Sequence, residues 1–393
     1  MSRSEITLKV LRDFQCLADD CPDNCCTHGW DIRVDQATLK KWEGLSDVNF
    51  REKILSNLTE RESHGVKETF IGGDGKRCSL MDENGLCTIH ATLGEEYLGE
   101  TCKTYPRMAK PFSRYILNSA VMSCPEVARM IVESKDKNMF VSDGELDVYE
   151  EHTYCINEFV SKVLNKNNYL LSSRVITISR FLYTIAGMSQ RGELSLAILN
   201  AISKKITKPL KEAERDIKSK RIKIDNQIVG KFWSIVYKII NKGVLVNSEV
   251  VISQHPIVAQ LDAADHSPES YDELYKHITK LKNNAKPILS KIIDDIGSKY
   301  LQVKFQAVGF PLDPPGENYI AAFLFGVLPY CYINMCLWII YDQKKSIAKN
   351  DVIDVIYRTE RIVQHTDRIY DIIVSNQQIL HINEFESCFA DLV

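Results

Sequence analysis

The stretch FQCLADDCPDNCCTHGW, residues 14–30, places Cys16, Cys21, Cys25 and Cys26 close together in the chain. The Pro, Asp and Asn residues between these cysteines favour turns. Thiolates on a short, turn-rich loop converge on one soft metal, and both zinc and iron–sulfur clusters take such ligands. Adjacent Cys25 and Cys26 rarely both bind one metal atom, so one of them serves a second centre or only packs. The stretch therefore predicts a cysteine-ligated metal site in the N-terminal region.

Cysteines are concentrated in the first third of the chain. Eight of the twelve lie within residues 16–124, and the other four are scattered over the remainder. The gaps between the eight are irregular, and the chain has no two matched Cys-x2-Cys knuckles of a zinc ribbon. This spacing favours an iron–sulfur cluster gathered from several loops, with structural zinc and unliganded thiols as alternatives. The candidate metal ligands are Cys16, Cys21, Cys25, Cys26, Cys78, Cys87, Cys102 and Cys124.

Two histidines lie near these cysteines in the sequence. His28 follows the Cys25-Cys26 pair, and His90 follows Cys87. Each is a candidate ligand or a hydrogen-bonding partner of a ligand. A lone histidine beside a cysteine loop is more often a hydrogen-bonded structural residue, and that is the preferred interpretation.

The composition is that of an ordinary soluble globular chain. Its 393 residues give room for two or three domains, and 45% of them are apolar. The 49 basic and 52 acidic side chains nearly balance, so no nucleic-acid-binding domain with a strongly basic face is expected. The polar start MSRSEIT lacks the apolar core of a signal peptide. We therefore expect a cytoplasmic protein, whose thiols stay reduced.

Residues 1–135 are expected to form a small cysteine-rich α+β domain that holds the metal. Residues 6–11 and 30–34 alternate in hydrophobicity like half-buried strands. Asp35 is placed to cap a short helix that runs through Trp42. These elements are short, so the region is predicted to be rich in turns.

A β-hairpin is predicted over residues 78–90. Asn84-Gly85 is a strong two-residue turn signal between apolar residues. Such a hairpin would bring Cys78 and Cys87 to the same end of a small ribbon. The glycine-rich run 72–76 lacks the spacing of a phosphate-binding loop and is interpreted as a turn.

Residues 150–393 are expected to form a predominantly helical domain, which makes the whole chain mainly α. Lys208-Pro209 and the Gly/Pro-rich run 309–316 are expected to separate helices. Apolar residues recur at three- and four-residue spacing in five segments, 169–188, 226–240, 272–296, 318–341 and 351–374.

Two stretches of this helical part have a second interpretation. Residues 318–341 carry no charge for 24 positions, which is long enough to cross a bilayer. Pro329 and Asn334 interrupt that run and no second span exists, so a buried core helix is preferred to a membrane-contacting segment. Residues 204–223 hold nine basic and three acidic side chains. A solvated helix face is preferred there, with an acidic partner or anionic lipid as the alternative.

No familiar catalytic motif occurs in the chain. The Gly-x-Gly-x-x-Gly fingerprint of a nucleotide or S-adenosylmethionine-binding Rossmann fold is missing, as are Gly-x-Ser-x-Gly and His-Glu-x-x-His. Catalytic residues and a cofactor pocket are therefore not assigned from the sequence.

The motifs around the cysteines resemble those of the bacterial flagellin lysine-N-methylase family. The resemblance rests on residues 11–30, on CSLMDENGLCTIH at 78–90 and on ETCKTYPR at 100–107. The cysteine core is also similar to a wider group of zinc- or iron-chelating domains. The similarity covers roughly residues 11–125, and the helical remainder has the length and character expected of the methylase family.

The resemblance implies a protein-lysine N-methyltransferase. Members transfer methyl groups from S-adenosylmethionine to surface lysines of flagellin in the bacterial cytosol, and a [4Fe–4S] cluster is associated with that activity. Carried onto this chain, the cluster takes its ligands from the eight cysteines. We expect Cys16, Cys21, Cys25 and Cys26 to lie close together, with the downstream four completing one or two centres.

The mechanism and two broader alternatives stay open. Radical S-adenosylmethionine enzymes typically use Cys-x3-Cys-x2-Cys, whereas here Cys21-x3-Cys25 is followed by His28. Radical and polar methyl transfer are therefore both retained. The alternative function is a non-catalytic zinc- or iron-binding interaction or redox protein. Peripheral contact with a membrane is the alternative to a wholly cytoplasmic location.

Overall fold

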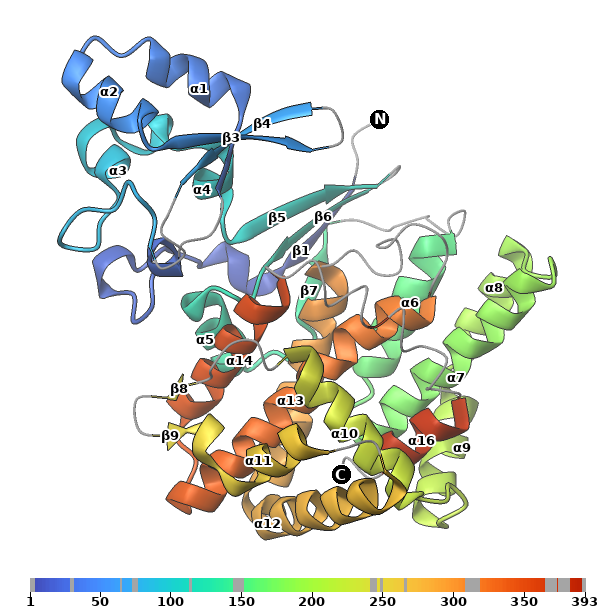
Figure 1. Ribbon diagram of the computed structural model, residues 1–393. Coiled ribbons are helices and arrows are strands. Elements are labelled where there is room, and N and C mark those ends of the chain that lie inside the picture. The colour runs from blue at the N-terminus through green and yellow to red at the C-terminus, as the bar shows by residue number, and fades with distance from the viewer. Residues whose placement is uncertain are drawn as a thin grey trace.

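The computed structural model is mainly α-helical with small β-sheets, as expected (Figure 1). It describes residues 4–390 apart from 29–31, 64–65, 73–76, 113–114, 144–151, 241–245, 248–249, 265–266, 308–318, 365–372 and 374–381. Most of the sheet structure lies in the first 142 residues, and helices dominate from residue 152 onward.

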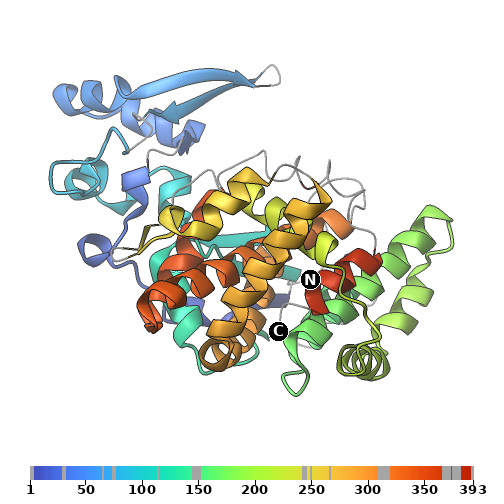
Figure 2. The same ribbon diagram turned by 60° about the horizontal axis from the view of Figure 1, so that its bottom comes forward.

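A three-stranded antiparallel sheet with short helices forms an outer unit, which we call the cysteine unit. Its strand order is β2-β4-β3, and it projects from the helical body in both views (Figures 1 and 2). Its small core consists of Val34, Trp42, Leu45, Ile54, Ile71, Cys78, Leu80 and Ile89. Its elements are β2 (Ile32–Val34), α1 (Gln36–Glu43), α2 (Val48–Leu55), β3 (Leu58–Ser63), β4 (Val66–Ile71), α3 (Thr88–Leu93), η4 (Glu95–Tyr97) and α4 (Glu100–Thr104).

The predicted cap of the first helix is confirmed. The Asp35 carboxylate accepts a hydrogen bond from the Thr38 backbone N–H at 2.8 Å, which satisfies one of the free donors at the start of α1. Trp42 on the same helix is fully buried, and its indole N–H donates to the Tyr97 carbonyl at 2.8 Å. The helix is thereby held at both ends of its buried face.

A second sheet belongs to the helical body. Its strand order is β5-β6-β1-β7, with β1 parallel to β6 and antiparallel to β7. Leu8, Tyr115 and Leu117 from this sheet share one hydrophobic core with the helices. The proposed boundary near residue 135 stays a prediction, and β7 pairs with β1 from beyond it. The elements are β1 (Ser4–Leu8), η1 (Lys9–Arg12), β5 (Arg107–Pro111), β6 (Tyr115–Ala120), α5 (Pro125–Glu133) and β7 (Phe140–Ser142).

The helical body is organised around a long helix, α12, against which α10 and α13 pack. Glycines permit two close approaches. A Cβ at Gly230 would lie 2.0 Å from the Tyr271 carbonyl oxygen, and one at Gly326 would lie 2.3 Å from the Phe305 ring. The helices are α6 (His152–Leu164), α7 (Leu171–Gln190), α8 (Leu196–Ser203), α9 (Thr207–Lys218), α10 (Asn226–Ile240), α11 (Pro256–Ala263), α12 (Pro268–Ala307), α13 (Tyr319–Lys344), α14 (Lys349–Gln364) and α16 (Ile382–Ala390), with η5 (Ile252–Gln254) and the short pair β8 (Val246–Asn247) and β9 (Val250–Val251).

Helix α13 is the charge-free segment singled out in the sequence. It is long and apolar enough to cross a bilayer, yet 89% of its most apolar window is buried inside the structure. Trp338 on this helix meets Trp233 of α10 edge to face, with ring centroids 5.4 Å apart. This packing is that of a core helix, the preferred interpretation.

A charged pair lies inside the same core. Lys304 of α12 and Glu360 of α14 are fully buried, and their charged atoms are 2.7 Å apart. Tyr300 donates a second hydrogen bond to the Glu360 carboxylate, and the Lys304 ammonium lies 4.8 Å from the Phe325 ring centroid. Each buried charge is therefore compensated, as burial requires.

Three segments are expected from the sequence to form turns or to separate helices. Pro209 does not separate two helices but lies in the first turn of α9, where a missing N–H costs no hydrogen bond. The expected loop at 309–316 and most of the turn at 72–76 lie outside the described residues.

Candidate metal centre

The first cysteine loop is built from 3-10 turns, η2 (Ala18–Asp20) and η3 (Cys25–His28). Asn24 fixes its end. The Asn24 side chain accepts a hydrogen bond from the Cys26 N–H at 3.0 Å and donates to the Gly85 carbonyl at 3.2 Å. Because Gly85 belongs to the second cysteine loop, Asn24 joins the two loops.

The second cysteine loop, residues 78–87, lies directly against the first. The Cys78 N–H donates to the Cys26 carbonyl at 2.7 Å. The Asp82 carboxylate accepts the N–H groups of Asn84 and Leu86 at 2.9 and 2.8 Å, which closes the loop. These contacts place Cys78 next to the Cys25-Cys26 pair.

The predicted β-hairpin over residues 78–90 is wrong in its extent. Gly85 has the positive φ of a turn, but only the isolated bridge between Met81 and Cys87 has strand-like pairing. Helix α3 begins directly after Cys87. The Asp82 side chain binds the Leu86 N–H that a hairpin ladder would have used, and the start of α3 ends the pairing on the other side.

Cys102 and Cys124 come from helices further along the chain. Cys102 lies within α4, whose start is fixed by the Asp35 carboxylate, which accepts the Glu100 N–H at 3.2 Å. Cys124 is the residue before α5. The Thr101 hydroxyl donates to the Arg33 carbonyl at 3.3 Å, so α4 is held against β2.

Five thiols interact electrostatically and form what we call the main thiol group. A hydrogen bond with the Cys26 thiol lowers the pKa of Cys25 to about 7, and the same bond raises the pKa of Cys26. Burial, followed by repulsion from neighbouring thiols, raises the pKa of Cys102 to about 12. The group draws on three segments of the chain and consists of Cys25, Cys26, Cys78, Cys87 and Cys102.

The remaining three thiols, Cys16, Cys21 and Cys124, form a smaller group. Burial raises the pKa of Cys124 to about 11, hydrogen bonds from backbone N–H groups of α5 oppose that rise, and the neighbouring Cys21 and Cys16 add to it. Cys21 interacts with both Cys16 and Cys25, so it lies between the two groups. The first four cysteines are thus divided between two groups in the structure.

The ligand assignment stays a prediction. Within the described residues, no three Cys, His, Asp or Glu side chains are placed as the ligands of one metal ion. A four-iron cluster sets a different requirement, because each iron takes its own thiolate and the sulfurs are spread over the width of the cluster. The soft donor set of the main thiol group suits such a cluster.

The two candidate histidines lie beside the cysteine loops, whereas the four later cysteines lie in the helical body. His90 is exposed on α3, and His28 is the last residue of η3. The four cysteines beyond the N-terminal region are buried within the helical body and belong to its core, and they are Cys155, Cys331, Cys336 and Cys388.

Arg361 of α14 is a residue of this site that the sequence analysis missed. Its guanidinium forms an ion pair with the Asp23 carboxylate at 2.7 Å and donates to the Asp23 carbonyl at 2.5 Å. It also donates to the Ser123 carbonyl at 2.9 Å. Burial raises the pKa of Cys21, and the positive charge of Arg361 opposes that rise. A hydrogen bond with the Cys26 thiol lowers the pKa of Cys25, and the charge of Arg361 acts in the same direction. No local signal in the sequence connects Arg361 with cysteines so far away, and only the fold brings them together.

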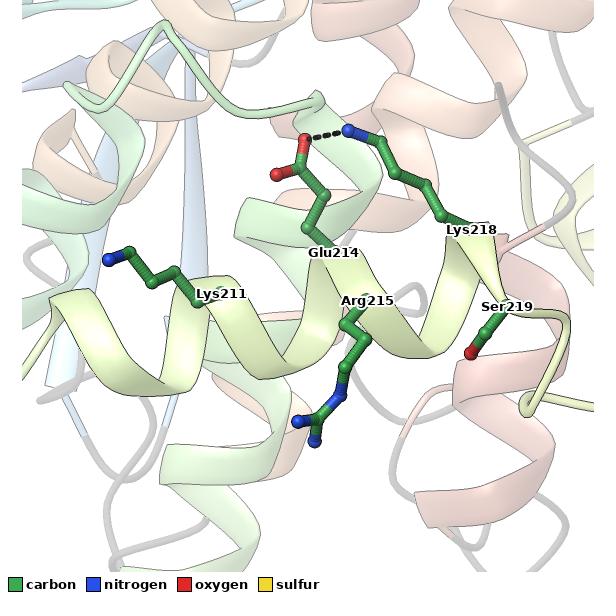
Figure 3. Close-up of a pocket in the computed structure, with 5 residues that line it drawn as sticks. All are labelled: Lys211, Glu214, Arg215, Lys218 and Ser219. Atoms are coloured by element: carbon green, nitrogen blue, oxygen red, sulfur yellow. Dashed lines mark ion pairs between the residues drawn. The ribbon is translucent and has the colours of Figure 1, made fainter.

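The basic segment of the sequence forms an open hollow of about 460 Å³ on α9 (Figure 3). Glu214 pairs with Lys218 at 3.2 Å, while Lys211 and Arg215 extend away from that pair in the close-up (Figure 3). Every lining residue comes from α9 or is its C-cap, Ser219, which agrees with the preferred interpretation of a solvated helix face.

A cleft of about 540 Å³ lies between α5, α12 and α14. It has the size of a small-molecule site. Its two carboxylates are already paired, since Asp294 contacts Arg174 at 3.1 Å and Asp295 contacts Lys299 at 2.7 Å. Its apolar wall consists of Val132, Ile292, Ile296, Ile347, Ala348 and Val352.

Comparison with known proteins shows which family the chain resembles. The profile of the FliB lysine N-methylase C-terminal domain matches residues 157–389. The chain is 31% identical to the flagellar biosynthetic protein FliU of Salmonella muenchen over 143 residues, which is 36% of this chain and 82% of that protein.

Two longer relatives are similar over a shorter part. The lysine-N-methylases of Salmonella typhimurium and Salmonella choleraesuis are each 32% identical over 126 residues, which is 31% of this chain and 31% of theirs. The chain therefore aligns with about a third of their length. No solved structure matches the chain.

Proposed function

The chain belongs to the FliB lysine N-methylase family, and we propose that it methylates surface lysines of flagellin with S-adenosylmethionine, in dependence on a cysteine-ligated [4Fe–4S] cluster. The family match covers more than half of the chain and supports the transferase activity. The flagellar name of the relative from Salmonella muenchen supports flagellin as the protein substrate. Such a substrate is met in the bacterial cytoplasm before it is exported.

The observation that carries the cluster proposal is the convergence of the main thiol group. We assign the four cluster thiolates to Cys25, Cys78, Cys87 and Cys102. Cys102 interacts with each of the other three, and Cys78 interacts with Cys25 and Cys87. Cys26 is assigned as the hydrogen-bond donor to Cys25, since adjacent cysteines rarely share one cluster. The sulfur atoms of these residues supply the ligands that iron–sulfur clusters take.

The smaller thiol group is proposed as a second or supporting centre. Cys16, Cys21 and Cys124 supply three thiols, one fewer than a cluster needs. When bound, an iron–sulfur cluster supplies a site of variable charge in the protein. The chain's own residues hold that site, and Arg361 provides a permanent positive charge beside it.

The transfer itself needs a neutral lysine amine in line with the sulfonium methyl group. A side chain or water must take the proton from the ammonium before attack, and excluding water favours the reaction. We assign no residue to this role, because the carboxylates of the helical body described above already form ion pairs with Arg or Lys side chains. The cleft between α5, α12 and α14 has both of its carboxylates occupied.

The test is a methylation assay with purified flagellin and labelled S-adenosylmethionine, using protein purified without oxygen. Incorporation of label into flagellin lysines is expected, together with a brown colour and absorbance near about 400 nm from iron–sulfur charge transfer. No label in flagellin would remove the proposed substrate. Colourless protein that contains zinc and methylates flagellin would leave the transferase in place and replace the cluster by a structural zinc site.

A further inference from the structure

One side chain of the family domain reaches into both cysteine-bearing segments. Arg361 lies on α14, within the part of the chain that matches the methylase family, and it is only 7% exposed. Its ion pair with Asp23 and its hydrogen bonds to the Asp23 and Ser123 carbonyls reach into the N-terminal region. Asp23 is in the loop between Cys21 and Cys25, and Ser123 directly precedes Cys124.

The contacts need the shape of an arginine. Nε donates to the Ser123 carbonyl, while the other two guanidinium nitrogens contact the carbonyl and the carboxylate of Asp23. One planar group thus joins two segments that are 100 residues apart in sequence. A lysine ammonium carries the same charge but lacks the fixed fork of donors.

The surroundings of Arg361 keep its charge in place. The guanidinium lies over the Tyr357 ring at 4.9 Å from the centroid, and Tyr357 is itself buried. Arg358 also approaches Asp23, but at 3.6 Å, and its side chain is 32% exposed. A charge held in a buried place acts more strongly on its neighbours than one in water.

We propose that Arg361 is a positioning residue through which the family domain sets the geometry and the charge of the cysteine site. It fixes the Cys21–Cys25 loop relative to Cys124, and it holds a positive charge beside the thiolates. This inference rests on the proposed cluster for one of its two consequences. A positive charge stabilises the more negative, reduced form of a cluster, so it raises the reduction potential. The other consequence, the rigidity of the two loops, does not require a cluster.

The experiment compares the wild type with three variants of the full chain. Arg361→Met removes both the positive charge and the planar set of N–H donors, whereas Arg361→Lys keeps only the charge. Arg358→Met is the matched control, because Arg358 lies on the same helix and approaches the same Asp23 carboxylate. Each protein is reconstituted with ferrous iron and sulfide without oxygen. The measurements are iron and sulfide per chain, the midpoint potential in a dye-mediated titration, and hydrogen exchange of metal-free protein.

We expect Arg361→Met to lose most of its iron and to have a lower potential in the fraction that keeps a cluster. Without metal, the amides of residues 21, 23–26 and 123–124 should exchange about tenfold faster, the factor expected from losing a charge-assisted contact. Arg361→Lys should restore the potential but only part of the exchange protection. Arg358→Met should leave all three measurements near the wild type.

The outcomes separate this inference from the proposed function. Iron-loaded wild type with an Arg361→Met variant that is unchanged in iron, potential and exchange would overturn the role of Arg361. Wild type without iron, combined with faster exchange in Arg361→Met, would remove the cluster and support the tie between the two regions. If Arg361→Met does not fold, exchange in Arg361→Lys decides, and protection equal to the wild type would overturn the inference.

Discussion

The cysteine unit and the helical body differ in how much apolar surface each of them buries. The core of the cysteine unit consists of eight buried residues, one of which is Cys78. The core of the helical body is continuous from β1 to α16 and includes nearly all of α13. Small cores rarely stabilise a fold without disulfides or metals. The comparison therefore predicts that the cysteine unit needs the proposed metal for its stability, whereas the helical body is stabilised by its own core.

The largest expected effect is the loss of a single thiolate. Cys102→Ala should lose both the metal and methylation, because the missing ligand opens the site and metal binding is coupled to folding of the unit. Cys25→Ala should behave in the same way. Iron analysis and the flagellin methylation assay measure the two losses.

The matched control for this prediction is Cys388→Ala. Cys388 is buried in α16 within the helical core. Its loss should change metal content little. Full metal content in Cys25→Ala and Cys102→Ala would show that the ligand assignment is wrong.

A second pair of variants tests whether the two cores are independent. Trp338→Ala in α13 should destabilise the helical body by about 3–5 kcal/mol, as buried tryptophans do when they are truncated. Trp42→Ala in α1 should unfold the cysteine unit and release the metal while the far-UV spectrum of the helices persists. Urea unfolding followed by circular dichroism, with iron content measured in parallel, distinguishes the two. A single shared transition in both variants would contradict separate cores.

Several helices and one cap were predictable because they depend on local spacing. Apolar residues at helical intervals marked α7, α10 and α13, and Asp35 in front of α1 has the side chain that an N-cap needs. These elements form where nearest neighbours in sequence are also neighbours in space. The family match agrees with the resemblance that the cysteine motifs showed.

The features that could not be predicted depend on tertiary contacts. The turn at Asn84-Gly85 is present, but Asp82 closes the loop with its side chain and a helix follows Cys87. The division of the eight cysteines into two groups also depends on how the loops pack. Arg361 is the clearest case, since its role arises only when α14 reaches the loops of Asp23 and Ser123.

A smaller effect is expected from the cap of α1. The hydrogen bond from the Thr38 hydroxyl, at 2.6 Å, holds the pKa of Asp35 at about 2, below the value of about 3.9 in an unfolded chain. A lowered carboxylate pKa stabilises the fold above the unfolded value and is lost as pH falls through the folded value. Asn caps a helix about as well as Asp, so Asp35→Asn should cost only the favourable charge at the helix start, about 0.3–1 kcal/mol near pH 6.

This difference between wild type and Asp35→Asn should shrink as the pH falls below about 4 and be lost as it falls through about 2, where the wild-type carboxylate loses its charge. Urea unfolding of metal-free protein across the pH range measures it. Asp35 also accepts the Glu100 N–H at the start of α4, so the variant should loosen the helix that carries Cys102. A difference that stays constant with pH would show that the carboxylate charge is not what caps the helix.

The smallest effect is expected on the basic face of α9 (Figure 3). The Lys218 side chain is 65% exposed and its pair with Glu214 is a surface contact, so Lys218→Ala should change stability by less than about 0.5 kcal/mol. Reversing two charges with Lys211→Glu and Lys218→Glu should likewise leave metal content and the KM for flagellin unchanged, because a solvated face contacts no partner. If the KM of the double variant exceeded that of the wild type at low salt and matched it at high salt, this prediction would be contradicted. Helix α9 would then be the surface that binds an acidic face of the substrate. In that case the helical body would contribute substrate binding to the enzyme, and the cysteine unit would contribute the metal.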